Sequence, residues 1–113
     1  NDFDRLNTAR ERSQKLNLII VLKSHHTATI TPSGNVYFNS TGNAGMATGG
    51  SGDVLTGIIT SLLAQNYSSD HSAILGVYLH GRAGDFAEVA LGQQAMSATD
   101  IITFLSQAFL SLK

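Results

Sequence analysis

The chain has 113 residues, a length that is enough for one modest hydrophobic core. It has no cysteine, which excludes disulfides and thiolate metal sites. Seven basic and eight acidic residues leave a net charge of -1, a balance that provides no basic surface for nucleic acid or an anionic membrane. No apolar run approaches the roughly 20 residues of a membrane helix, and the first residues lack the pattern of a signal or transit peptide, so we expect a cytoplasmic protein.

The first part of the chain predicts one helix and three strands. Apolar residues recur at three- or four-residue steps over residues 3–16, with charged residues between them, as in an amphipathic helix. The continuous apolar run over 18–22 suits a strand buried on both faces, as in an α/β sheet. Residues 27–31 and 36–39 predict a hairpin around the turn 32–35, because proline presets φ and glycine tolerates a positive φ.

A polar loop and a long apolar helix follow. Residues 40–52 are dominated by Gly, Ser, Thr and Asn, and they hold five of the eleven glycines. Asp53 is expected to open a helix that continues through Leu63, with Asn66 as its stop signal.

Two further helices complete the chain. Ser69 or Asp70 is expected to cap the first, which Gly92 ends, and Thr99 or Asp100 is expected to cap a final amphipathic helix. Three strands do not supply the neighbours and cover that a doubly buried strand needs. We therefore expect strands to be missing and this chain to be part of a larger α/β unit.

The segment 43–53 carries the strongest chemical signal. Glycines let several backbone N–H groups point into one concavity, and the following helix adds unpaired N–H groups at its positive end. Such a loop suits a phosphate or a developing oxyanion. It is not a P-loop, because no Gly-Lys-Ser/Thr follows, and it lacks the dinucleotide fingerprint Gly-x-Gly-x-x-Gly.

Asp53 is the only charged residue between Lys23 and Asp70. A carboxylate at this position has two explanations. It caps the helix, as Asp often does, or it accepts a proton from a hydroxyl that attacks phosphorus. The residues alone leave both interpretations open.

Three stretches carry a family resemblance. Residues 49–53, Gly-Gly-Ser-Gly-Asp, resemble the Gly-x-Gly-Asp signature of ribokinase-like enzymes. Residues 39–57, 21–27 and 78–85 resemble the ADP/ATP-dependent NAD(P)H-hydrate dehydratase family almost residue by residue, although Ser24 stands where that family usually has Gly. The resemblance covers nearly the whole chain but only about the C-terminal half of the family's domain.

The resemblance implies a fold, a reaction and a site. The fold would be a ribokinase-like three-layer α/β/α sandwich, with residues 1–113 as its C-terminal portion. The reaction would remove water from the 6-hydroxyl of hydrated NADH or NADPH: Asp53 deprotonates the hydroxyl, a phosphoryl group is transferred to it, and elimination restores the ring. ADP in bacteria or ATP in eukaryotes would be the co-substrate, with Mg²⁺ held by its phosphates.

The resemblance also assigns individual residues. Nucleotide binding falls on Lys23, Ser24, His25, His26, Thr27, Asn43, Gly45, Met46, Gly50 and Gly52. The anion hole comprises Gly49, Gly50, Ser51 and Gly52, and Asp53 binds the substrate hydroxyl.

At several positions a purely structural role is an alternative to ligand binding. If the family resemblance is set aside, Lys23 is equally well explained as a charge at the end of a strand that reaches water. His25 and His26 read as a polar pair at a strand edge, and no metal site is expected, because adjacent strand residues face opposite sides and no third ligand is near. His80 and Asp85 read as structural hydrogen-bonding groups among small residues that permit close helix approach, and Met46 reads as a packing residue.

Two other functions remain open: a ribokinase-like small-molecule kinase with a stable phosphorylated product, and a non-catalytic nucleotide-binding fragment. For the favoured dehydratase, the expected partners are NAD(P)H hydrate, an adenine nucleotide, the missing N-terminal part of the domain and further copies in a homo-oligomer. Neither nucleic acid nor a membrane is expected.

Overall fold

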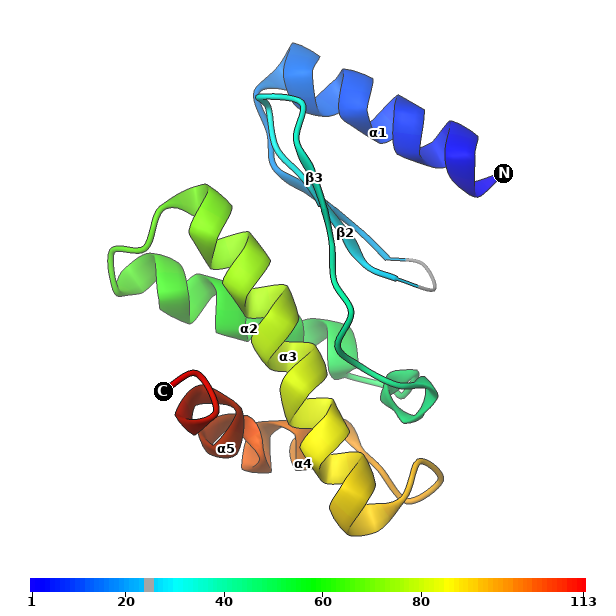
Figure 1. Cartoon of the computed structure of the whole chain (residues 1–113), viewed down its shortest axis with the longest axis vertical. Helices are drawn as coiled ribbons and strands as arrows, with labels where there is room; N and C mark the ends of the chain where they lie inside the picture. The colour runs from blue at the N-terminus through cyan, green and yellow to red at the C-terminus, as the bar shows by residue number, and fades with distance from the viewer. Residues whose placement is uncertain (24–25) are drawn as a thin grey trace.

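The computed structural model describes residues 1–23 and 26–113. Figure 1 shows α1 along one side of a small sheet and the remaining helices gathered on the other side. The elements are α1 (Asp2–Leu16), β1 (Ile20–Leu22), β2 (Ala28–Ile30), β3 (Val36–Phe38), the 3-10 turn η1 (Ala44–Met46), α2 (Ser51–Ala64), α3 (Ser69–Leu91), α4 (Ala98–Thr103) and α5 (Leu105–Leu110).

The three described strands form an antiparallel sheet in the order β1-β2-β3, with Val21 opposite Thr29 and Thr29 opposite Tyr37. The predicted hairpin is confirmed: Gly34 has φ 91°, and the Thr31 amide donates to the Asn35 carbonyl at 3.0 Å.

The expectation of a doubly buried strand over 18–22 is wrong for the described sheet. The strand is shorter, Ile20–Leu22, and its residues are only partly buried, while Leu18 before it is exposed. β2 is the buried strand, because it alone has a neighbour on each side.

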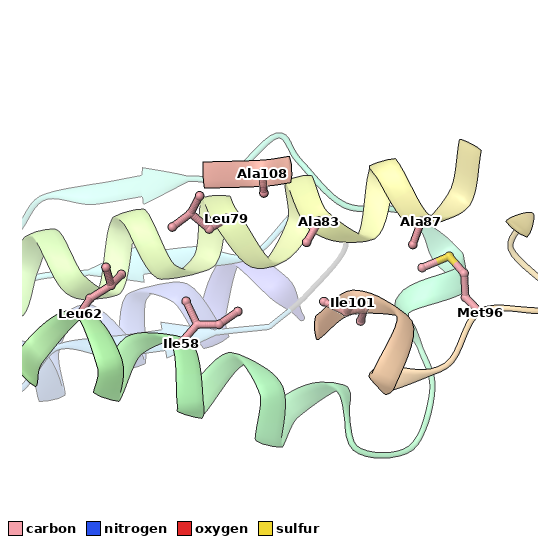
Figure 2. Close-up of a cluster of buried hydrophobic side chains, with 8 residues drawn as sticks. All are labelled: Ile58, Leu62, Leu79, Ala83, Ala87, Met96, Ile101 and Ala108. Atoms are coloured by element: carbon pink, nitrogen blue, oxygen red, sulfur yellow. The ribbon is translucent and has the colours of Figure 1, made fainter. Parts of the chain in front are cut away.

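The hydrophobic core lies among the helices. The contact between α2 and α3 is the most extensive contact between two described helices, and α4 and α5 pack on α3 (Figure 2). Gly76 permits the close approach of α3 to α2, because a Cβ there would lie 2.6 Å from Ile59 Cγ1. The core side chains are Ile58, Leu62, Leu79, Ala83, Ala87, Met96, Ile101 and Ala108.

Two helix starts differ from the sequence expectation. Ser68 caps α3, because its hydroxyl accepts the His71 amide at 3.1 Å, so the cap lies one residue before Ser69. Ser97 precedes α4, and the Asp100 carboxylate accepts the Ser97 amide at 2.8 Å in a capping box.

The predicted ends of two helices are confirmed, but the prediction of one final helix is not. Asn66, with φ 71°, follows α2, and Gly92, with φ 80°, ends α3, both as expected. The single final helix is wrong: Phe104 separates α4 from α5. Among the described helices, none is both long and apolar enough to cross a membrane.

Candidate functional site

A cleft of about 550 Å³ lies where the end of β1, the start of β2, the loop after β3, the first turn of α2 and the middle of α3 meet. Polar groups predominate at the strand ends and in the loop, whereas α2 and α3 contribute Leu55 and Val77. The other lining residues are Lys23, His26, Thr27, Asn39, Ser40, Thr41, Gly42, Asn43, Ala44, Met46, Ala47, Ser51, His80 and Gly81.

The cleft brings together site residues predicted from distant parts of the sequence. Six of them line it: Lys23, His26, Thr27, Asn43, Met46 and Ser51. Five others are not among its lining residues: Gly45, Gly49, Gly50, Gly52 and Asp53. Ser24 and His25 lie outside the described residues.

Lys23 leaves β1 and reaches the first turn of α2. A Cβ placed on Gly52 would lie 3.2 Å from the Lys23 Nζ, and the Lys23 carbonyl accepts a hydrogen bond from Arg5 of α1 at 3.3 Å. No side chain in the described ranges caps the start of α2. A cation and a positive helix end repel one another unless an anion lies between them. This arrangement therefore fits a phosphate.

Gly50 is the N-cap of α2, with φ 88°. That φ lies in the left-handed region, where glycine carries no penalty from a Cβ. Asp53 is the third residue of the helix, so the N-cap interpretation of Asp53 is wrong, and so is the expectation that Asp53 opens the helix. Its exposed carboxylate lies in the first turn, where it interacts favourably with the helix dipole.

Asp85 of α3 holds the loop that forms one wall of the cleft. Its carboxylate accepts the Gly42 amide and the Asn43 side-chain amide, each at 3.0 Å. The side-chain oxygen of Asn43, Oδ1, in turn accepts the Gly45 amide at 3.0 Å. The structural role expected for Asp85 is confirmed, and the Asn43 side chain is engaged in shaping the loop.

The same loop packs closely on α3. A Cβ on Gly81 would collide with Thr41, and one on Gly84 would collide with the Met46 side chain. Gly81 and Gly84 therefore allow the loop to pack closely on α3, whereas the sequence analysis expected them to allow close approach of another helix. Met46 is a packing residue, as expected. Thr41, whose hydroxyl lies 3.0 Å from the Tyr78 carbonyl oxygen, was missed as a cleft residue, because no local pattern marks a contact across 37 positions.

His80 joins α3 to the start of α2. Its Nε2 lies 3.0 Å from the Ser51 carbonyl oxygen and 3.2 Å from the Ser51 hydroxyl, and both residues are buried. Burial lowers the pKa of His80, the bond to Ser51 opposes this, and the positive charge of Lys23 lowers it further. The hydrogen-bonding role is confirmed, but its place in the cleft was not foreseen from the sequence.

The fold and the site define a ribokinase-like protein. The ADP/ATP-dependent NAD(P)H-hydrate dehydratase from Bacillus subtilis, co-crystallised with ATP and Mg²⁺, superposes with a TM-score of 0.91 at 29% identity, over 99% of this chain and 40% of that one. A ribokinase-like superfamily protein from Enterococcus faecalis superposes with a TM-score of 0.68 at 35% identity, over 91% of this chain and 37% of that one. The profile of the family described as NAD(P)H-hydrate dehydratase matches residues 1–107, and the chain belongs to that family.

Curated relatives agree with this assignment. The bifunctional NAD(P)H-hydrate repair enzyme of Moorella thermoacetica is 46% identical over 97% of this chain. The ADP-dependent (S)-NAD(P)H-hydrate dehydratase of Neisseria meningitidis is 44% identical over 79% of it. The chain spans 21% of the first relative's length and 30% of the second's.

Proposed function

We propose that this chain forms the nucleotide-binding and proton-accepting part of an enzyme that dehydrates (6S)-NAD(P)H hydrate to NAD(P)H with ADP or ATP. One observation carries the proposal: in a member of the dehydratase family, Lys23 and the uncapped first turn of α2 meet at a cleft that polar side chains help to line. That arrangement suits the phosphates of a nucleotide.

The donor set of the cleft fits an adenine nucleotide. Lys23 supplies an ammonium group, Ser51 a hydroxyl, and the first turn of α2 its backbone N–H groups. His26 and Thr27 line the cleft next to Lys23. The described residues contain no group of three or more His, Cys, Asp or Glu that could hold a metal. In the proposal Mg²⁺ therefore accompanies the nucleotide and is held by its phosphates.

The proposal gives the start of α2 two roles. The backbone from Gly49 to Gly52 is the anion hole, and it stabilises negative charge where the phosphate reacts. Asp53, one residue further along, accepts the proton of the substrate hydroxyl. The exposure of its carboxylate supports this role, since a base must be reachable by substrate.

The proposal also includes the rest of the domain. We propose that residues 1–113 are the C-terminal part of a single domain whose N-terminal part completes the sheet and the substrate pocket. Phe3 and Phe38 are 70% and 64% exposed beside a hollow of about 180 Å³ between α1 and the sheet, an apolar surface that suits such a partner. A homo-oligomer and a cytoplasmic location belong to the same proposal.

The test uses the complete domain and, separately, the 113-residue chain. With NADPH hydrate and ADP or ATP, the complete domain should restore the absorbance of NADPH and release phosphate in equal amounts. The chain alone should do neither. A stable phosphorylated product would favour the small-molecule kinase, whereas nucleotide binding without turnover would favour a non-catalytic role. Robust turnover by the chain alone would contradict the need for an N-terminal part.

A further inference from the structure

His80 is a buried side chain for which the proposed reaction provides no role. It lies on α3, it is 8% exposed, and it lines the cleft together with Ser51 and Lys23. Ser51 is the first residue of α2 and is 4% exposed. The contact between His80 and Ser51 links two helices at the point where the proposed anion site begins.

The geometry determines which ring nitrogen of His80 carries a proton. A carbonyl oxygen only accepts hydrogen bonds, so Nε2, 3.0 Å from the Ser51 carbonyl oxygen, must be protonated. The Ser51 hydroxyl, 3.2 Å from the same nitrogen, then acts as an acceptor as well. With its oxygen so engaged, the Ser51 hydroxyl has its own proton left to donate, and it makes no other hydrogen bond within residues 1–23 and 26–113.

We propose that His80 is a positioning residue: by donating its Nε2–H to Ser51, it holds the start of α2 at the cleft and directs the Ser51 hydroxyl proton toward a bound phosphate. This inference rests on the proposed function, because it assumes that the phosphate of a nucleotide occupies the cleft. His80 itself acts through Ser51. Burial, which lowers the pKa of His80 and keeps the ring neutral, is consistent with this arrangement.

Two amide substitutions of His80 distinguish the loss of its hydrogen bond to Ser51 from the loss of the imidazole ring. In His80→Gln the side-chain nitrogen reaches the place of Nε2, whereas in His80→Asn it reaches only the place of Nδ1. Both are neutral and polar, so a difference between them reports the contact with Ser51. His71→Asn is the matched control, since His71 is an exposed histidine on the same helix and does not line the cleft.

The experiment measures ADP affinity of the complete domain by calorimetry, and thermal unfolding of each variant. We expect His80→Gln and His71→Asn to bind ADP as the wild type does, and His80→Asn to bind about tenfold more weakly, the worth of one good hydrogen bond. Ser51→Ala should weaken binding by a similar factor. The double variant Ser51→Ala/His80→Asn should lose less affinity than the product of the two single losses, because both substitutions act in part through the same Ser51 hydroxyl.

Each contrary outcome is distinct. Wild-type ADP affinity in His80→Asn, or losses that multiply in the double variant, would overturn the positioning role and leave the proposed function intact. A purely structural His80 would lower the unfolding temperature of His80→Asn without changing ADP affinity measured well below it. Failure of the wild-type domain to bind ADP would overturn the proposed function and this inference together.

Discussion

The ammonium group of Lys23 lies against Gly52, so that a Cβ on Gly52 would be only 3.2 Å from Nζ. Lys23 directly follows β1, and Gly52 is the second residue of α2. Their approach places a full positive charge at the positive end of α2, and an anion bound between the two would be stabilised by both. The pair is therefore the point at which a substitution should report most directly on nucleotide binding.

Gly52→Ala should weaken nucleotide binding and lower turnover by about tenfold to a thousandfold, by analogy with the loss of an oxyanion donor. The added methyl group requires the Lys23 ammonium to shift slightly, and it narrows the approach to the backbone. Gly52 has no positive φ, so the fold should be little affected. The measurement is ADP affinity and steady-state kinetics of the complete domain. Gly57→Ala is the control, because a Cβ there meets nothing within 4 Å; equal behaviour of the two variants would contradict the prediction.

Gly50→Ala should act on stability as well as on binding. Gly50 has φ 88°, and an added Cβ would lie 3.3 Å from the Ala98 Cβ. The left-handed conformation alone costs a non-glycine residue about 1–2 kcal/mol. Gly50→Asn should cost less, because Asn tolerates this conformation and is a good N-cap. Denaturant unfolding measures the free energy of unfolding of both variants. If Gly50→Ala were as stable as the wild type, the positive φ of Gly50 would make no contribution.

Asp53→Asn should abolish most turnover while leaving the fold intact. Since Gly50 is the cap, the substitution removes only a charge in the first turn of α2, worth about 0.3–1 kcal/mol. If Asp53 is the base, turnover should fall by about two to four orders of magnitude. ADP affinity should stay or rise, because a negative charge near the phosphates is gone.

Restored NADPH absorbance and released phosphate should be followed together in the Asp53→Asn variant. Near-wild-type rates in both would end the assignment of this carboxylate as the base. Glu88→Gln provides a control for the loss of one acidic charge, since Glu88 lies toward the far end of α3 and does not line the cleft.

The stability of the protein should fall as the pH drops below about 6.5, in part because of His80. Its pKa is lowered from the ordinary value of 6.5 in the folded state. Between the folded and unfolded pKa values the unfolded chain binds more protons, so stability rises with pH through that window and is lost as the pH falls. Urea midpoints measured across this range should show a shallower loss for His80→Gln, and identical pH profiles would refute the contribution.

Local chemistry explains what could be predicted. The turn 32–35 needs only proline and a glycine that adopts a positive φ, and both are present in the sequence. The glycine-rich loop and the apolar helix after it are equally local, and so are the ends of α2 and α3 at Asn66 and Gly92. The resemblance over residues 39–57, 21–27 and 78–85 then correctly indicated the family.

Errors arose where several local solutions are chemically equivalent. Asp53, like Asp100, is a good capping residue, but both lie in the third helical position while Gly50 and Ser97 precede the helices. The apolar run over 18–22 reads the same in a central strand and at the edge of a described sheet, because hydrophobicity does not count neighbouring strands.

The amino-acid sequence by itself determined the hairpin, the glycine-rich loop, the helical periodicity and the family. Only the tertiary structure decided that Lys23 meets Gly52, that Asp85 holds the loop at Gly42 and Asn43, and that His80 bonds Ser51 across 29 positions. The physical reason is the range of the forces involved. Turn and cap preferences depend on neighbouring residues along the chain, whereas these contacts exist only once hydrophobic packing has brought α2, α3 and the strand ends together.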